Sequence, residues 1–355
     1  MENRLYVDVH IIQTVPPSCV NRDDTNSPKT AVYGGVTRAR VSSQSWKKAV
    51  RDMFRNESMF APEKLGSRTK KIVDMVAVEI AKLDNTLDAE QSARKILEVA
   101  GLKIKPEEKG TGALFPISLA QAKALARLAA SNQGVDKKTA QQALNDSPSI
   151  DIALFGRMVA DDPSLNIDAC AQVAHAISTH KVSNEFDYFT AVDDLSPEDS
   201  AGAGHIGTVE FNSSTLYRYA TVAVHELRVL LGDDTADAVC EFVRAFACSM
   251  PTGKQNSFAN RTVPNAMLVA LRLDQPANFV GAFEKPIVTR GGYAEESTVA
   301  LVGHAEKTYQ NWLSEPKKSF VVGEISLASV VPCSLKEMLS CLNGAVIDML
   351  ANKGA

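Results

Sequence analysis

Hydrophobic and polar residues alternate along residues 4–13, where Leu5, Val7, Val9 and Ile11 fall on one face. A period of two is typical of a β-strand with one buried face. Other alternating or β-branched runs predict further strands, and helical spacing after a serine or aspartate predicts helices. We expect strands at 4–13, 168–181, 208–224 and 264–273, with helices at 43–56 and 234–250. This order, β-α-β-β-α-β, predicts a ferredoxin-like α+β fold, which RNA-recognition modules share with many unrelated proteins.

Residues 57–148 interrupt this order with a mostly helical pattern of apolar and alanine-rich segments. Ser147 and Pro148 indicate where this insertion ends, and we expect the apolar run that follows them to be a strand. Residues 14–40 are rich in Pro, Gly, Asn and Asp and predict one long ordered loop. Two more helices are expected near the C-terminus, around 296–313 and 334–350.

The composition indicates a cellular compartment and shows that charge is distributed unevenly along the chain. The chain has 355 residues, 45% hydrophobic and 23% charged, as in soluble globular proteins. We expect no signal peptide, no membrane span and, with six scattered cysteines, a reducing cytoplasm. The net charge is −4, yet residues 22–55 contain eight basic and three acidic residues, a local charge of +5. Such a segment can attract a polyanion locally, although a charge run by itself is more often a solvated face.

Three glycines, Gly202, Gly204 and Gly207, have the G-x-G-x-x-G spacing of a dinucleotide-binding loop. A dinucleotide site needs these glycines after a strand and before a helix, so that the pyrophosphate lies at the helix N-terminus. Here they follow an acidic stretch and lead into the predicted strand at 208–224. We therefore interpret 184–210 as a long hairpin with a flexible tip, and we expect no cofactor and no metal.

Several uncommon strings, in this order, resemble a known family: "NRDD", "YGG", "SSQSWKK", "FGRM", "GHIGTVEF" and "PTGKQNSFA". They are similar to the backbone subunit of the type I-E CRISPR surveillance complex, the CasC family of Cascade within the RAMP superfamily. The resemblance implies an RRM-like palm (1–56 and 149–355), a helical fingers insertion (57–148) and a thumb hairpin (184–210).

The same resemblance implies a non-catalytic, cytoplasmic protein of a prokaryote that polymerises along CRISPR RNA and presents its bases to target DNA. Its implied partners are copies of itself and the large subunit, the small subunit, the guide-processing endoribonuclease and the subunit that caps the guide 5′ end. A guide must be held whatever its sequence, and phosphate contacts suit that task.

Cations and helix-start groups in the matching strings can supply such contacts. Lys47 and Arg51 are four residues apart, on one face of the predicted helix. By resemblance Arg157 contacts RNA, Met158 wedges beside a kinked base, and two thumb residues press on the kinked nucleotide. The candidate RNA-binding residues are Arg22, Lys29, Ser42, Gln44, Lys47, Lys48, Arg51, Arg157, Met158, His205, Ile206, Lys254 and Gln255. For Lys48, ordinary helix solubility is an equal alternative, and Met158 could be core.

Two other function classes stay open. Acidic pairs such as Asp23/Asp24 suggest a metal-dependent endoribonuclease that uses Asp24, as in related type III subunits, although neighbouring carboxylates do not by themselves build a two-metal site. Asp8 and His10 share the polar face of the first strand and could act as acid, base or metal ligand. A plain adaptor that touches RNA incidentally is the third class, and the salt dependence of binding distinguishes it.

Overall fold

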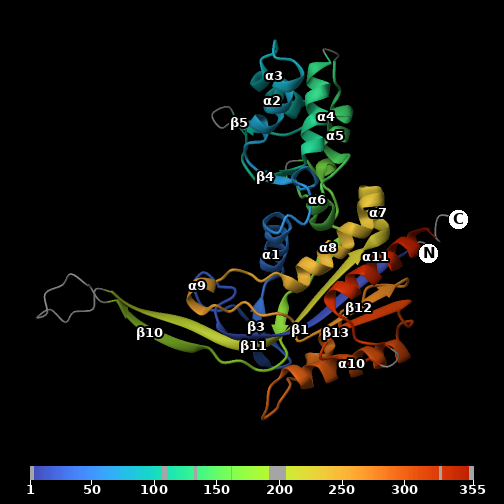
Figure 1. Ribbon diagram of the computed structural model, residues 1–355. Helices are drawn as coiled ribbons and strands as arrows, with labels where there is room; N and C mark the ends of the chain where they lie inside the picture. The colour runs from blue at the N-terminus through green and yellow to red at the C-terminus, as the bar shows by residue number, and fades with distance from the viewer. Residues whose placement is uncertain are drawn as a thin grey trace, which may run out of the picture.

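The computed structural model describes residues 4–105, 110–131, 134–160, 162–191, 205–327 and 330–351. Within these ranges an open antiparallel sheet of nine strands forms the body (Figure 1), in the order β13-β12-β1-β11-β9-β3-β2, with β8 and β10 also paired to β11. The strands are β1 (Tyr6–Ser18), β2 (Thr30–Tyr33), β3 (Val36–Val41), β8 (Ala171–Val173), β9 (Ala176–Ser178), β10 (Glu185–Ala191), β11 (His205–Ala223), β12 (Ala266–Arg272) and β13 (Lys318–Gly323).

Helices cover both faces of this sheet. The central strand β1 pairs with β11 on one side and β12 on the other. Its residues Val7, Val9 and Ile11 pack into a core with α8 and α11, whereas Ile12 packs into a second core with α10 and Phe279. The helices of the body are α1 (Ser43–Asn56), α6 (Ile150–Phe155), α7 (Val224–Leu231), α8 (Thr235–Cys248), α9 (Gln255–Phe258), α10 (Ala294–Asn311) and α11 (Leu335–Ala351). The protein is therefore an α+β protein whose sheet is buried on both sides of β1.

The insertion has a core of its own. Figure 1 shows its helices projecting above the sheet, and its buried residues, such as Ile72, Leu97 and Leu125, pack together as one cluster. Its elements are β4 (Ser67–Thr69), α2 (Ile72–Leu83), α3 (Ala89–Val99), β5 (Ile104–Lys105), β6 (Gly110–Thr111), β7 (Phe115–Ile117), α4 (Leu119–Ala130) and α5 (Lys137–Asn145). The pairs β4–β7 and β5–β6 form two small ladders.

Strands β10 and β11 pair as an antiparallel ladder that extends away from the body (Figure 1). The acidic stretch and the first two glycines of the glycine motif, within 192–204, lie outside the described residues. Gly207 lies under the ring of Phe189, where an added Cβ would be 2.4 Å from the ring. The glycine of this motif that the structure describes therefore makes room for an aromatic side chain within a strand.

Two sequence expectations are wrong. The apolar run after Pro148 is helix α6, not a strand, and all six of its residues are buried. A short apolar run gives no periodicity that separates a buried strand from a buried helix. The segment 14–40 is not one loop, because β2 and β3 form a hairpin within it. Its turn is Gly34-Gly35, both with positive φ, as a two-residue hairpin turn requires.

The expected strand at 168–181 is also divided, since β8 and β9 are separate three-residue strands along β11. Among the described helices, none combines the length and apolar character that crossing a bilayer requires.

Candidate nucleic-acid interface

A crevice opens between three segments that are far apart in the sequence: the loop 19–29, helix α1 and the loop 251–255. Its volume is about 300 Å³, and Arg22, Lys48 and Thr252 line it from the three sides. We call this cavity the α1 crevice. Two of the predicted residues, Arg22 and Lys48, line it, because the fold brings the loop 19–29, helix α1 and the "PTG" part of the "PTGKQ" string together.

The loop 19–29 is held in shape by its own polar groups. The Asp23 carboxylate accepts hydrogen bonds from the Thr25 hydroxyl (2.8 Å) and from the backbone N–H groups of Thr25 (2.9 Å) and Ser27 (3.0 Å). These bonds, that from the Thr25 hydroxyl above all, lower the pKa of Asp23. Arg22 donates to the Asn26 side chain at 3.0 Å and remains exposed. The loop thus presents the Arg22 guanidinium from a preformed turn.

Asn21 ties this loop to the start of α1. Its side-chain oxygen accepts the Ser42 N–H at 2.9 Å, and its carbonyl accepts the Lys29 N–H at 2.8 Å. Ser42 itself is buried and caps the helix, with its hydroxyl accepting the Ser45 N–H at 3.3 Å. Ser42 therefore shapes the helix start through its hydroxyl, whereas Gln44 in the first turn is exposed.

Helix α1 is fixed to the sheet by a buried arginine. Arg218 lies 3.6 Å from the centre of the Trp46 ring and 4.6 Å from that of Phe246, and burial lowers its pKa to about 9. Such stacking holds the helix by cation–π and dispersion contact. On the outer face, Lys48 pairs with Asp52 one turn later while its side chain stays largely exposed. The contact of Arg218 with Trp46 therefore fixes the orientation of α1 beside the α1 crevice.

The loop 251–255 touches the loop 19–29 through Gly253. A Cβ on Gly253 would be 2.1 Å from the Val20 carbonyl oxygen and 2.7 Å from that of Cys19. Lys254, the next residue, has φ of 48°, a left-handed conformation, and begins the short helix α9 with the exposed Gln255. At position 253 only glycine, which has no Cβ, fits so close to the backbone of Cys19 and Val20.

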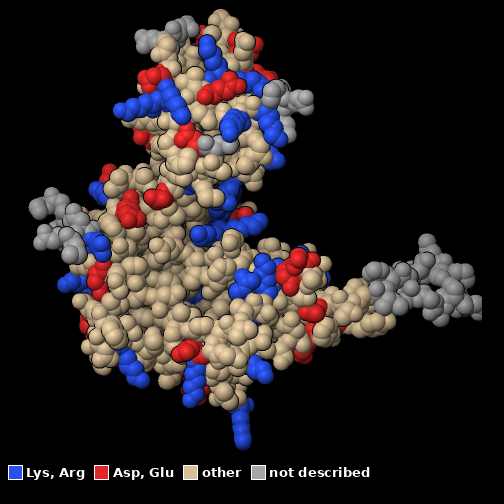
Figure 2. All heavy atoms as spheres, turned by 180° about the vertical axis from the view of Figure 1, so that it is seen from behind, with Lys and Arg blue, Asp and Glu red and all other residues tan. Residues whose placement is uncertain are grey.

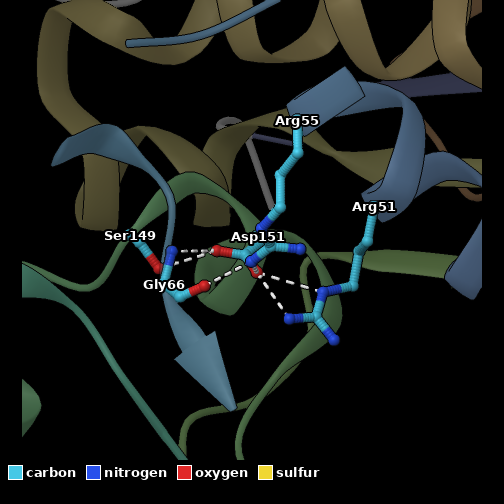
Figure 3. A network of polar contacts seen from close by, with 5 residues as sticks. All are labelled: Arg51, Arg55, Gly66, Ser149 and Asp151. Carbon is cyan, nitrogen blue, oxygen red and sulfur yellow. Dashed lines mark hydrogen bonds and ion pairs between the residues drawn. The ribbon is translucent and has the colours of Figure 1, made fainter. Parts of the chain in front are cut away.

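A second group of cations, Arg51 and Arg55 of α1, surrounds Asp151 (Figure 3). The buried Asp151 carboxylate accepts hydrogen bonds from the Ser149 hydroxyl (2.8 Å) and the Gly66 N–H (2.7 Å) through one oxygen. Its other oxygen is 2.9 Å from Arg51 and 3.5 Å from Arg55, which also donates to the Gly66 carbonyl. Arg51, predicted as a phosphate contact, is thus ion-paired within the protein, and its side chain is only 12% exposed.

Two more cations adjoin this network. Burial, together with the charge of Arg68, lowers the pKa of Lys47, and burial together with Arg51 lowers that of Arg68. Across the described ranges, no hydrogen bond or ion pair engages the side chain of Lys47 or Arg68. Figure 2 shows Lys and Arg side chains gathered where the helical insertion meets the sheet body.

In the "FGRM" string, the side chain of Arg157 is buried and that of Met158 is exposed. Arg157 is 2% exposed, donates to the Leu165 carbonyl and the Asn145 side chain at 2.8 Å each, and lies over the Phe115 ring. Its guanidinium is therefore a buried structural group in this fold, and the expected phosphate contact does not match its position. Met158, by contrast, is 84% exposed, so it is a surface residue, not core.

The described residues of the hairpin leave two predictions open. The side chains of His205 and Ile206 lie outside the described parts of the chain. Strand β10 is exposed along its length, including Phe186 and Tyr188.

Asp8 and His10 do not form an accessible acid–base pair. Both are fully buried, Asp8 accepting hydrogen bonds from the Tyr219 hydroxyl (3.0 Å) and the Ala277 N–H (2.9 Å). Burial raises the pKa of Asp8 to about 6 and lowers that of His10, stacked on Phe279, to about 3. Over the part of the chain that the structure describes, no three His, Cys, Asp or Glu side chains converge in a way that could hold a metal ion.

Comparison with known proteins agrees with this architecture. The sequence profile of the CT1975-like protein family matches residues 7–342. The chain belongs to the CT1975-like protein family.

Solved structures are similar to this CT1975-like protein over nearly its whole length. A chain of "CRISPR RNA-guided surveillance complex, pre-nicking" is 32% identical, with a TM-score of 0.81 over 96% of this chain and 100% of that one. A chain of "CRISPR RNA-guided surveillance complex" is 30% identical, with a TM-score of 0.62 over 95% of this chain and 99% of that one. No curated protein matches the sequence.

Sequence reasoning missed four residues of the CT1975-like protein's interface: Arg55, Arg68, Gly253 and Asp151. For Arg55 the sequence leaves phosphate contact and ordinary helix solubility as equal alternatives, and Gly253 belongs to a glycine-containing loop that by resemblance contacts the RNA backbone. Arg68 and Asp151 belong to segments that the sequence places outside the basic stretch, and tertiary structure alone brings them against α1.

Proposed function

We propose that this protein is a backbone subunit of a type I-E CRISPR surveillance complex, a CasC-type member of the RAMP superfamily that binds CRISPR RNA without catalysis. The observation that carries the proposal is the α1 crevice, where the loop 19–29 contributes Arg22 and α1 contributes Lys48 to one cavity, beside Asp23, Asp52 and the loop 251–255. The similarity to chains of CRISPR RNA-guided surveillance complexes supports the same class of complex.

The chemistry of the crevice suits a phosphate backbone. Arg22 and Lys48 are exposed on it, with Lys48 paired to Asp52. In the flanking segments Lys29 and Lys254 are half-buried, and Gln44 adds an exposed amide in the first turn of α1. Cations and amides of this kind bind phosphate oxygens without reading bases. One protein can then hold any guide sequence.

The sheet gives no platform for stacked bases, because both faces of β1 are covered. The order β12-β1-β11-β8/β9 supports a ferredoxin-like, RRM-like palm, with 57–148 as fingers and 184–210 as thumb. RNA-recognition modules stack bases on their sheet. Here the RNA lies along α1 and the loops instead, so its bases stay free to pair with a target DNA strand.

The partners follow from this role. Copies of the chain polymerise along one guide in the cytoplasm of a prokaryote, with Met158 and the thumb residues His205 and Ile206 beside the kinked nucleotides. The large and small subunits, the guide-processing endoribonuclease and the subunit that caps the guide 5′ end complete the complex.

The test is the mass of complexes formed on single-stranded RNAs of increasing length, measured by mass photometry. The proposal expects mass to rise by one protomer for each fixed number of nucleotides, whatever the sequence, with the RNA intact. One protomer at every length contradicts it. Loss of RNA with magnesium that disappears in Asp24→Ala supports the endoribonuclease alternative instead.

A further inference from the structure

A small cavity beside α1 is lined by two buried polar side chains that have no partner. Its volume is about 110 Å³, and it lies between α1, the end of α8 and the segment 251–261. Ser249 and Asn260 line it, with exposed fractions of only 4% and 1%. Within the described residues, neither the Ser249 hydroxyl nor the Asn260 side-chain NH₂ group has a hydrogen-bond partner. We call this cavity the Asn260 pocket.

Two unpaired polar groups at one cavity indicate that something outside the described chain completes them. A buried polar group without a partner destabilises a folded protein, and native structures leave few such groups unexplained. The partner of Ser249 and Asn260 is therefore either ordered water or a group of a ligand.

The chemistry of the Asn260 pocket favours a neutral group that both donates and accepts hydrogen bonds. The Asn260 NH₂ group requires an acceptor, whereas the Ser249 hydroxyl can accept or donate. Two carboxylates, Asp52 and Glu57, and one cation, Arg261, also line the pocket. This excess of negative charge disfavours a phosphate group inside it.

The size and the lining of the pocket also disfavour a nucleobase. Proteins that bind single strands without sequence preference stack the bases on aromatic side chains. Among the described residues that line the Asn260 pocket, none is aromatic. Its volume has room for only a few water molecules. A sugar hydroxyl is small enough, is neutral, and both donates and accepts.

The Asn260 pocket adjoins the α1 crevice. Four residues line both cavities: Ala49, Asp52, Pro251 and Thr252. Ribose and phosphate alternate along an RNA backbone, so a strand whose phosphates lie at the crevice brings a ribose next to the pocket.

We propose that the Asn260 pocket binds a ribose 2′-hydroxyl and makes this protein select RNA over DNA. Asn260 donates to the 2′-oxygen, and Ser249 accepts the hydroxyl proton. The 2′-hydroxyl is the group by which a protein tells RNA from DNA at a given site. This inference rests on the proposed RNA-binding function and adds to it the choice of sugar.

The test compares RNA with a strand of the same sequence that carries 2′-fluoro groups, by fluorescence anisotropy. The 2′-fluoro sugar keeps the RNA-like pucker but cannot donate and accepts poorly, so the comparison isolates the hydroxyl. The strand is the shortest that binds one protomer in mass photometry. We expect wild type to bind RNA about fivefold more tightly than the 2′-fluoro strand, the effect of one hydrogen bond. DNA of the same sequence should bind no better than the 2′-fluoro strand.

Two variants locate the effect. Ser249→Ala and Asn260→Leu should each bring the affinity ratio close to one. The Ser249 hydroxyl has no partner in the free protein, so Ser249→Ala should not lower the melting temperature. The matched control is Ser257→Ala, which removes an exposed hydroxyl from α9 and should leave the ratio unchanged.

Equal affinity of wild type for RNA and the 2′-fluoro strand overturns the proposal, and so does a full fivefold ratio in both pocket variants. A lower melting temperature of Ser249→Ala with the full ratio assigns the pocket to ordered water. Altered self-association without RNA at the full ratio assigns it to a protein segment, and both results count against the proposal. In all these cases, wild type that binds RNA in length-dependent steps leaves the proposed function standing.

Discussion

Substituting Gly253 with alanine tests whether the α1 crevice depends on one close backbone approach. The new Cβ would lie 2.1 Å from the Val20 carbonyl oxygen and 2.6 Å from its carbon. An ordinary carbon–oxygen contact is about 3.3 Å or more, so the two loops must separate by roughly 1 Å. Both obstructing atoms are backbone, and no side-chain rotation can relieve the clash.

Overpacking of this kind costs about 1–3 kcal/mol of unfolding free energy. Because the displaced loop carries Lys254 and faces Arg22, we expect the RNA dissociation constant to rise about tenfold, equivalent to about 1.4 kcal/mol. Urea unfolding and RNA anisotropy measure the two effects on the same preparation.

The matched control is Gly303→Ala in α10, where an added Cβ meets no atom within 4 Å. Alanine in a helix interior is expected to stabilise the protein by about 0.5–1 kcal/mol and to leave RNA affinity unchanged. If Gly253→Ala has wild-type stability and affinity, the loops do not need their close contact, and the reasoning about the crevice fails.

Three further predictions concern single residues. Burial raises the pKa of Asp8 to about 6 from its usual value near 3.9, so Asp8 binds its proton more tightly in the folded state. The free energy of unfolding should therefore fall by about 3 kcal/mol as pH rises from about 4 to about 6. Asp8→Asn should remove this fall, as measured by urea unfolding at a series of pH values. Arg157→Lys should lower the unfolding free energy by about 2–4 kcal/mol, because it leaves buried acceptors unpaired, yet should not change the salt slope of RNA binding; a lower slope with unchanged stability would contradict its structural role. Met158→Ala should change stability by less than about 0.5 kcal/mol, since the side chain is exposed, and should weaken RNA binding measured by anisotropy; unchanged affinity would rule out a contact.

The periodicity of apolar residues along the chain predicts several of the helices and strands of this protein. Alternation in β1 and helical spacing in α1 predict those elements, because the apolar residues of each follow one complete period. The structure buries both faces of β1, which the alternation did not indicate. The run that became α6 is apolar on every side, so its pattern could not distinguish helix from strand. The hairpin β2–β3 was predicted as loop, although its Gly34-Gly35 turn was present in the sequence as a signal.

For the candidate site, too, some features follow from the sequence and others only from the tertiary structure. The sequence alone determined that the basic residues of the first loop and α1 are close in the chain. The tertiary structure decided that Arg22 and Lys48 are exposed at one crevice. Only tertiary structure decided that Arg157 is buried and that Asp151 neutralises Arg51. A residue's type fixes its charge, but its exposure and its partners depend on the segments that the fold packs around it, as Asp151 reaches Arg51 from 100 positions away.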